Sequence, residues 1–254
     1  MSAPLLKLER IQKSFGANHV LRGVDIDVAP GKSLVIIGGS GSGKSVMLKN
    51  ALGLMTPDAG QVIFDGSDVT HANGRAREAM RARIGMLFQS AALFDSLTVW
   101  ENVAFRLIHA DGVKRKDAKA RAIETLRKVR LAPDVADLRP AEISGGMQKR
   151  VGLARAIASQ PDLIFFDEPT TGLDPITADA INDLIVEQVK ALGAATVSIT
   201  HDMPSARKIA DEIAMLFEGR IIWRGPAGEV DKSENAHVDQ FVKGLAEGPI
   251  QPGF

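Results

Sequence analysis

A glycine-rich loop at residues 38–45 carries the strongest chemical signal in the sequence. Its letters, GGSGSGKS, satisfy the pattern G-x-x-x-x-G-K-[ST] between an apolar run and a helical pattern. Glycines let successive backbone N–H groups point at a phosphate, while Lys44 can reach the β- and γ-phosphates and the Ser45 hydroxyl can bind Mg²⁺. The loop predicts a nucleoside triphosphate site, and its other members are Gly38, Gly39, Ser40, Gly41, Ser42 and Gly43.

Two adjacent carboxylates follow a second apolar run, in LIFFDEP. Ligands of α/β proteins bind where parallel strands end, so this run brings Asp167 to the binding edge of a sheet. There Asp167 can hold the Mg²⁺ shell, and Glu168 can polarise an attacking water as a general base, an effect of about 10²–10⁴-fold. Taken alone, Asp-Glu-Pro after a strand is an ordinary turn. The phosphate loop in the same chain favours the catalytic interpretation.

A second group suited to anions is ISGGMQKR, at residues 143–150. Ser144, Gly145 and Gly146 stand directly before an amphipathic helix that carries Met147, Val151, Ala154 and Ala158 on one face. The start of a helix has free backbone N–H groups, which attract anions. The chain therefore contains two segments able to hold phosphate.

Four further residues have a functional and an ordinary interpretation each. His201 could contact a γ-phosphate, although a single histidine is more often structural. Gln89 could reach Mg²⁺ or water, or be a polar loop residue. Phe15 could stack on a nucleobase or belong to the core. Asp174 could contribute to the site or cap the helix that starts near Pro175.

The elements that position these residues alternate between strands and helices. Residues 5–15 and 20–28 alternate apolar and polar side chains, as antiparallel strands with one wet face do. Short apolar runs typical of a buried parallel sheet occupy 33–38, 162–167, 195–200 and 212–217. Helical patterns follow the first three, which predicts right-handed βαβ units and an α/β doubly wound core.

The predicted organisation is a single cassette with an inserted helical subdomain. Residues 1–89 and 159–225 form the core, and residues 90–158 hold only helical patterns. The segment 226–254 is a tail with one short helical pattern. An apolar stripe on this pattern predicts that it does not stay in water; its members are Val238, Phe241, Val242 and Leu245.

Composition narrows the class of protein. The 254 residues are 45% hydrophobic and 24% charged, which suits a globular α/β domain. Lys plus Arg and Asp plus Glu both number 31, so net charge indicates neither nucleic acid nor an anionic membrane. Without cysteine there are no disulfides or thiolate sites. No signal peptide or apolar run of about 20 residues is present, so we expect a soluble, cytoplasmic protein.

The order of these motifs resembles the nucleotide-binding subunits of ABC transporters over about residues 5–225. The resemblance implies a P-loop NTPase (RecA-like) core with an antiparallel β-subdomain, an ATPase activity, and ATP and Mg²⁺ as ligands. It implies two cassettes paired head to tail, so that the signature of one chain, here Ser144 to Gln148, caps the γ-phosphate in the other chain's phosphate loop. Each ATP would then be held by the phosphate loop of one chain and the signature of the other.

The same resemblance assigns the remaining roles. Phe15 would stack on the base, Gln89 would be the Q-loop residue, Asp174 the D-loop residue and His201 the switch histidine. The signature departs from the common L-S-G-G-Q at Ile143 and Met147. With Met147 in place of the glutamine of the common signature, one polar contact of a side-chain amide is lost. Ser144 and the backbone N–H groups can still bind phosphate.

A narrower resemblance is to the ATPases of the maintenance-of-lipid-asymmetry (Mla) systems among the MCE-type lipid transporters. It rests on ISGGMQKRVGLARAIA and on the tail QFVKGLAEGPI. It implies a peripheral homodimer on the cytoplasmic face of an inner membrane that powers phospholipid transport between two membranes. The implied partners are a permease, an MCE lipid-binding protein and a small STAS-type subunit.

Other classes of function share some of these motifs. An amino-acid or other small-solute importer is the main alternative, because cassettes do not bind the cargo. Soluble ABC ATPases of translation usually fuse two cassettes and those of DNA repair carry long coiled coils, and neither feature occurs here. Residues 114–130 contain eight basic and two acidic residues, but the lack of interleaved aromatic residues favours a solvated helix face over a nucleic-acid site.

Overall fold

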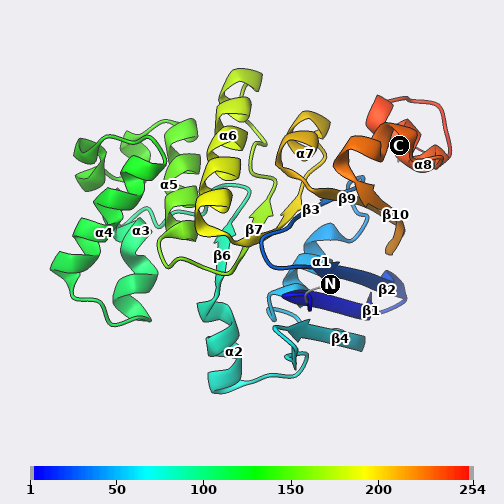
Figure 1. Ribbon diagram of the computed structural model, residues 1–254, viewed down its shortest axis with the longest axis horizontal. Helices are drawn as coiled ribbons and strands as arrows, with labels where there is room; N and C mark the ends of the chain where they lie inside the picture. The colour runs from blue at the N-terminus through cyan, green and yellow to red at the C-terminus, as the bar shows by residue number, and fades with distance from the viewer. Residues whose placement is uncertain (1–2, 252–254) are drawn as a thin grey trace. The chain divides into compact units, whose positions relative to one another are not determined.

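The computed structural model describes residues 3–251 (Figure 1). The chain forms two compact units. The first unit combines residues 1–81 with residues 197–254, and the second contains residues 82–196. These units are defined by packing, so the predicted division into core, helical subdomain and tail stays a prediction.

The strands predicted from the alternating pattern near the N-terminus are confirmed, and they form an antiparallel sheet in the first unit. The strands are β1 (Leu6–Phe15), β2 (Asn18–Val28), β4 (Ala59–Phe64) and β5 (Ser67–Asp68), in the order β2-β1-β4-β5. Leu6, Leu8 and Ile11 of β1 are buried, as are alternate residues of β2 between Val24 and Val28. One face of these strands therefore packs into the core.

The first unit also contains the strand that leads into the glycine-rich loop. β3 (Ser33–Ile37) pairs in parallel with β9 (Glu212–Phe217), which pairs antiparallel with β10 (Arg220–Pro226). The interior positions of β3 and β9 are apolar and buried, which confirms the interpretation of both runs as core strands. The helices of this unit are α1 (Lys44–Ala51), α2 (Gly74–Ala82), α7 (Met203–Ile209) and α8 (Ala236–Lys243), and a 3₁₀ turn spans Ala227–Lys232.

The second unit joins two parallel strands to a group of helices. β6 (Ile84–Leu87) and β7 (Leu163–Asp167) pair in parallel, and Ile84 lies opposite Leu163. Between them the chain is helical, as predicted: α3 (Val99–His109), α4 (Arg115–Lys128), 3₁₀ turns at Pro133–Asp137 and Pro140–Glu142, and α5 (Gly145–Ile157). After α6 (Pro175–Leu192), β8 (Ala195–Ile199) leads the chain back to the first unit.

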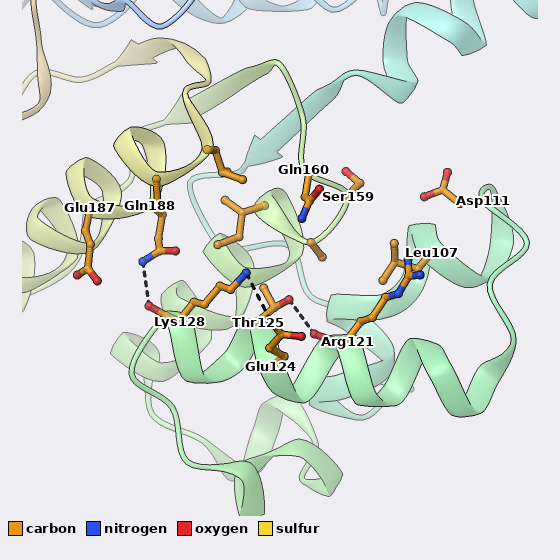
Figure 2. A pocket seen from close by; sticks show the side chains of 14 residues that line it. Leu107, Asp111, Arg121, Glu124, Thr125, Lys128, Ser159, Gln160, Glu187 and Gln188 are labelled. Atoms are coloured by element: carbon orange, nitrogen blue, oxygen red, sulfur yellow. Dashed lines mark hydrogen bonds and ion pairs between the residues drawn. The ribbon is translucent and has the colours of Figure 1, made fainter.

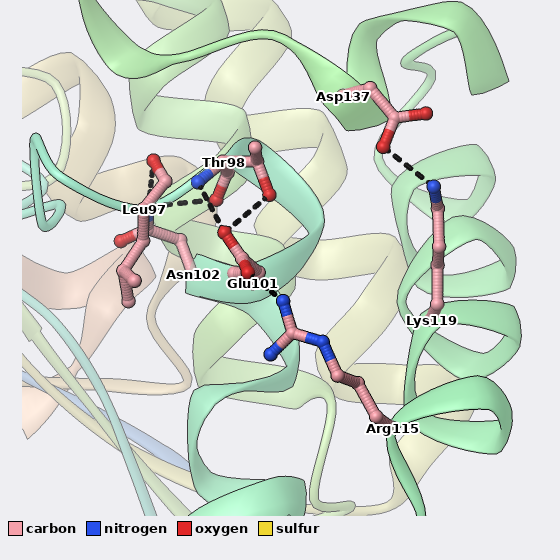
Figure 3. A network of polar contacts seen from close by, with 7 residues as sticks. All are labelled: Leu97, Thr98, Glu101, Asn102, Arg115, Lys119 and Asp137. Carbon is pink, nitrogen blue, oxygen red and sulfur yellow. Dashed lines mark hydrogen bonds and ion pairs between the residues drawn. The ribbon is translucent and has the colours of Figure 1, made fainter.

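The start of α3 is fixed by polar contacts (Figure 3). Thr98 and Glu101 form a capping box in which the Glu101 carboxylate accepts from the Thr98 N–H at 2.8 Å. The fully buried Asn102 amide donates to the carbonyls of Phe94, Leu97 and Thr98, and its oxygen accepts from the Phe94 N–H at 2.7 Å. These contacts hold the segment that connects β6 to α3.

The tail is part of the first unit and packs within it along part of the predicted apolar stripe. Val238 of α8 is fully buried, and the Asn235 side chain donates to the Ile222 carbonyl of β10. Leu245 lies beyond the end of α8 and is 54% exposed, so this member of the stripe stays in contact with water. Among the residues described, no helix has the length and hydropathy required to cross a membrane.

Candidate functional site

Glycine is required at two positions of the loop between β3 and α1. A β-carbon on Gly38 would lie 2.3 Å from the Leu216 carbonyl oxygen, and Gly38 has a φ of +154°. Gly43, with a φ of +106°, would place a β-carbon 2.9 Å from a Leu21 methyl group. Larger side chains would force the loop away from these neighbours, and glycine alone adopts such φ values readily. The loop is therefore shaped by close backbone approach.

Polar groups of the same loop suit a phosphate ligand. Lys44 Nζ lies over the loop and donates to the carbonyls of Gly38 at 2.6 Å and Gly39 at 2.8 Å. Within the described part of the chain, Ser42 Oγ is buried without a hydrogen-bond partner. Buried hydroxyl groups normally have partners, so an anion that accepts from Ser42 would satisfy this group. The ammonium group and the orphaned hydroxyl both fit a nucleotide phosphate.

Two other predicted residues lie in the first unit. Phe15 ends β1 with 49% of its surface exposed, and Lys13 Nζ lies 5.8 Å from the centre of its ring. An exposed aromatic ring at a strand end is available for stacking, which is not what a core phenylalanine would show. His201 follows β8 and lines a hollow of about 320 Å³ with residues of the tail, among them Phe241 and Leu245.

The paired carboxylates lie at the end of β7, as predicted. Asp167 is the last residue of the strand, and Glu168 has a left-handed backbone with a φ of +48°. One Glu168 carboxylate oxygen accepts from Thr171 Oγ1 at 3.0 Å. Glu168 is partly exposed, so its carboxylate can reach a water molecule. This arrangement is consistent with a general base.

The second anion-binding segment is the start of α5. Ser144 is the exposed N-cap, and its Oγ accepts from the Met147 N–H at 3.3 Å. Gly145 is exposed, with open space where a β-carbon would lie. A β-carbon on Gly146 would lie 3.2 Å from Thr177 Cγ2 of α6. Thus the helix presents its N-terminus to solvent, beside the start of α6.

Asp174 and Gln148 both have ordinary structural roles in this unit. Asp174 caps α6 by accepting from the N–H groups of Ile176 and Thr177, and hydrogen bonds led by that of the Thr177 hydroxyl lower the pKa of Asp174. The Gln148 amide donates to the carbonyls of Pro140 at 2.9 Å and Ile143 at 3.4 Å. Gln148 therefore braces the segment before the signature, and contact with a nucleotide stays a prediction for both side chains.

Lys149 is a residue of the site region that the sequence analysis did not identify. Its Nζ donates to the backbone carbonyls of Gln89, just after β6, and Glu168, just after β7. Burial lowers the pKa of Lys149, whereas the Asp167 and Glu168 carboxylates act in the opposite direction. A lysine in the first turns of a helix is disfavoured by the helix dipole, and this was the available signal of a specific partner.

Arg155, on the same helix, holds the chain that follows Gln89. Its guanidinium donates to the carbonyls of Ala91 at 2.6 Å and Ala92 at 2.7 Å. Both alanines have left-handed backbones, with φ values of +59° and +46°. Gln89 and Glu168 are thereby tied to one helix, α5, which begins just after Ser144.

The donor set predicted for a cation suits Mg²⁺. Ser45 carries a hydroxyl oxygen, Gln89 an amide oxygen and Asp167 a carboxylate. Mg²⁺ prefers such oxygen ligands and is commonly held by one or two carboxylates together with substrate phosphates. Magnesium remains a proposal on these grounds.

A larger hollow in the second unit is not part of this set (Figure 2). It measures about 730 Å³ and lies among α4, α6 and the end of α5. Two of its polar side chains are hydrogen-bonded to backbone of the same hollow: the Gln188 amide donates to the Lys128 carbonyl at 3.1 Å, and Thr125 Oγ1 donates to the Arg121 carbonyl at 2.8 Å. The residues predicted to bind nucleotide do not line it, and we assign it no ligand.

The known proteins that are similar to this chain include ATP-binding proteins of transport systems. Residues 21–171 match the ABC transporter family. The intermembrane phospholipid transport ATP-binding protein MlaF of Haemophilus influenzae is 35% identical over 99% of this chain and 95% of the relative. The probable ribonucleotide transport ATP-binding protein mkl of Mycobacterium leprae is 36% identical over 96% of this chain and 70% of the relative.

A solved structure supports the same fold. The ATP-binding cassette MJ0796, described as a dimer in a post-hydrolysis state bound to ADP and Pi, is 31% identical and superposes with a TM-score of 0.79. The match covers 87% of this chain and 98% of that cassette. The predicted P-loop NTPase fold is thereby confirmed.

Proposed function

We propose that this chain, which belongs to the ABC transporter family and is an ATPase, powers the transport of phospholipid between membranes. The observation that carries the lipid assignment is the near end-to-end match to intermembrane phospholipid transport ATP-binding proteins. That match extends over the tail as well as the cassette. The relative named for ribonucleotide transport is covered over only 70% of its length.

The proposed roles in hydrolysis follow from the residues and their surroundings. Lys44 binds the β- and γ-phosphates, and the orphaned Ser42 hydroxyl donates to a phosphate oxygen. Ser45, Gln89 and Asp167 would hold Mg²⁺, which would neutralise phosphate charge when bound. Glu168 takes the proton of the attacking water, a role that its place after β7 and its partial exposure support.

His201 and Phe15 complete the proposed site in the first unit. His201 contacts the γ-phosphate, and Phe15 stacks on the base with the ring face that its exposure leaves available. Ring stacking binds nucleobases through their π-faces with little sequence preference. Asp174 contributes at the start of α6, where its carboxylate is already fixed by backbone N–H groups.

The active form in this proposal is a homodimer. Ser144, Gly145 and Gly146 cap the nucleotide that the partner's loop holds, which accounts for an anion-binding helix start separate from the chain's own phosphate loop. The exposed N-terminus of α5 supports this role, because free N–H groups and the helix dipole attract phosphate. The related cassette MJ0796 has been solved as a dimer.

The proposed setting is the cytoplasmic face of an inner membrane, where the homodimer binds a transmembrane permease. An MCE lipid-binding protein and a small STAS-type subunit are the further proposed partners. Transport of another small solute, such as an amino acid or a ribonucleotide, is the alternative, and the name of the mycobacterial relative favours keeping it. Both alternatives use the same ATPase chemistry.

Purification of the intact complex would distinguish these cargoes. The tagged chain is extracted from its own membranes in mild detergent, and co-purifying proteins and lipids are identified by mass spectrometry. A permease with an MCE-type protein, and phospholipid enriched over a detergent extract of an unrelated tagged membrane protein, is the expected result. A soluble solute-binding protein carrying an amino acid or nucleotide, without lipid enrichment, would overturn the lipid assignment.

A further inference from the structure

Lys149 occupies an unusual place for a positively charged side chain. It lies in the first turns of α5 and is only 6% exposed. Burial disfavours a charged ammonium group, and the positive end of the helix dipole adds to that cost. A lysine remains charged in such a place only when specific acceptors compensate it. The hydrogen-bond acceptors around Lys149 therefore indicate its role.

The acceptors are backbone carbonyls from two segments that are distant in sequence. One belongs to Gln89, just after β6, and the other to Glu168, which lies 3.3 Å away just after β7. β6 and β7 are parallel neighbours, so these segments leave the same edge of the strand pair. One ammonium group therefore fixes two segments that carry proposed site residues, and the nearby Asp167 and Glu168 carboxylates help to keep it charged.

The contact matters most at Glu168 because its backbone is in a strained conformation. A φ of +48° is uncommon for a residue with a side chain and persists only where neighbouring contacts hold it. Two donors converge on the Glu168 carbonyl, Lys149 Nζ and the Thr171 N–H, each at 3.3 Å. If Lys149 were absent, the Glu168 peptide could rotate toward an ordinary conformation and carry its carboxylate with it.

We propose that Lys149 is a positioning residue for ATP hydrolysis, which holds the Glu168 backbone and the Gln89 segment in their working geometry. The inference rests on the proposed role of Glu168 as the general base. Lys149 acts through the two carbonyls and does not touch the nucleotide. Its loss therefore lowers turnover while the chain's own phosphate loop keeps its affinity for ATP.

The experiment compares Lys149→Met with the parent protein as an ATPase with excess Mg²⁺. Methionine keeps a long, unbranched side chain but cannot donate to either carbonyl. We expect kcat to fall by about 10- to 100-fold, because small displacements of a catalytic group have effects of this size. The KM for ATP, and the binding of a fluorescent ATP analogue to the monomer, are expected to stay unchanged.

Two further variants separate positioning from general damage. Lys149→Arg keeps the charge and several donors, so it restores most of the lost kcat. Lys128→Met makes the same chemical change on α4 of the same unit, where Lys128 contacts Glu124 and neither carbonyl, and it hydrolyses ATP at the parent rate. If Lys149→Met does not fold, Lys149→Gln, which has an uncharged amide NH₂ on a shorter chain, is expected to be slower than Lys149→Arg.

The outcomes that overturn the inference are distinct from those that overturn the proposed function. If Lys149→Met hydrolyses ATP at the parent rate while Glu168→Gln is inactive, the positioning role is wrong and the proposed function stands. A fall in kcat that Lys149→Arg does not restore, or that comes with an equal loss of ATP binding, also removes it. If Glu168→Gln is active, Glu168 is not the general base, and the inference about Lys149 that rests on this role is wrong as well.

Discussion

Thr171 donates hydrogen bonds to both the carboxylate and the backbone carbonyl of Glu168 in the turn that follows β7. Its hydroxyl donates to a Glu168 carboxylate oxygen at 3.0 Å, and its N–H donates to the Glu168 carbonyl at 3.3 Å. The side chain of the proposed base is thereby oriented by a contact that needs only an acceptor oxygen. An amide at position 168 could accept the same hydrogen bond, so a substitution can remove the base and keep the geometry.

Glu168→Gln is therefore expected to separate ATP binding from hydrolysis. The amide oxygen still accepts from Thr171. The glycine-rich loop and the start of α5, which are the two proposed phosphate-binding segments, are unchanged, so the variant binds ATP normally. Hydrolysis falls by about 10²–10⁴-fold because the amide cannot take a proton. Phosphate release measures the rate, and sedimentation with ATP and Mg²⁺ shows a persistent dimer.

The matched control for this variant is Glu187→Gln on α6. Glu187 pairs with Arg130 at 3.0 Å on an exposed face, and its loss should leave turnover unchanged. Hydrolysis by Glu168→Gln at near the parent rate would show that another group activates the water.

A second expectation concerns the exposed helix start. Ser144→Arg places a cation where the free N–H groups of α5 favour an anion. We expect ATP-driven dimerisation to be abolished, while each monomer still binds nucleotide through its own phosphate loop. Titration with a fluorescent nucleotide measures monomer binding, and sedimentation in the Glu168→Gln background measures the dimer.

Ser144→Ala distinguishes the effect of charge from the loss of the cap. This variant loses the hydrogen bond from the Met147 N–H, which destabilises the helix by about 1 kcal/mol, but adds no cation. It should still dimerise with ATP, although more weakly than the parent, because the proposed Ser144 contact is lost while the free N–H groups of α5 remain. An equal loss of monomer nucleotide binding in Ser144→Arg would instead show that Ser144 acts within its own chain.

The sequence predicted the elements that are defined by continuous patterns. β3 and β7 are apolar runs whose burial needs no knowledge of their neighbours, and the glycine loop has a pattern with a direct physical cause. β4 and β10 were not identified. β10 contains charged or small residues such as Arg220, Arg224 and Gly225, and most of its residues are only half-buried. It therefore shows neither a continuous apolar run nor a regular alternation of apolar and polar residues.

Contacts between distant segments explain the other differences. The partners of Lys149 lie 60 and 19 residues away, and periodicity along one helix carries no information about them. The stripe of α8 predicted burial for Leu245, but the helix ends at Lys243, before Leu245 is reached. A left-handed Gly244 then directs the chain away from the helix axis.

A third expectation concerns acid stability and the capping box of α3. Hydrogen bonds, led by that from the Thr98 N–H, lower the pKa of Glu101 below its ordinary value of 4.5. A carboxylate with a depressed folded pKa stabilises the protein fully above the ordinary value, and this stabilisation is lost as the pH falls through the folded value. Glu101→Gln removes the charge that faces Arg115 and keeps an acceptor oxygen.

Urea unfolding of the parent and Glu101→Gln tests this expectation from neutral pH into acid. The variant is expected to be less stable at neutral pH, and the difference should shrink to nothing below the folded pKa of Glu101. Glu124→Gln, at an exposed position of α4, should show little difference at any pH. A difference for Glu101→Gln that is constant across the range would mean that its charge does not contribute.

The last expectation concerns the tail, of which residues 252–254 lie outside the described part. Deletion of residues 236–254 removes Val238, which is fully buried, so the monomer should lose roughly 1.5–3 kcal/mol of stability. We expect it to remain folded and to bind ATP, because the glycine loop and its neighbours are intact. Homodimerisation, or capture of the partner subunits, should weaken, since Leu245 leaves apolar surface exposed near His201.

A point variant separates tail order from loss of the core contact. The Gln240 amide donates to the carbonyls of Leu245 at 3.1 Å and Ile250 at 2.9 Å, and its oxygen accepts from the Ile250 N–H at 2.7 Å. Gln240→Ala releases this segment while Val238 stays in place, so association should weaken with a smaller loss of stability. Sedimentation with and without ATP measures association, and thermal unfolding measures stability. Unchanged association in both variants, or a truncated chain that does not fold, would leave the tail with a structural role only.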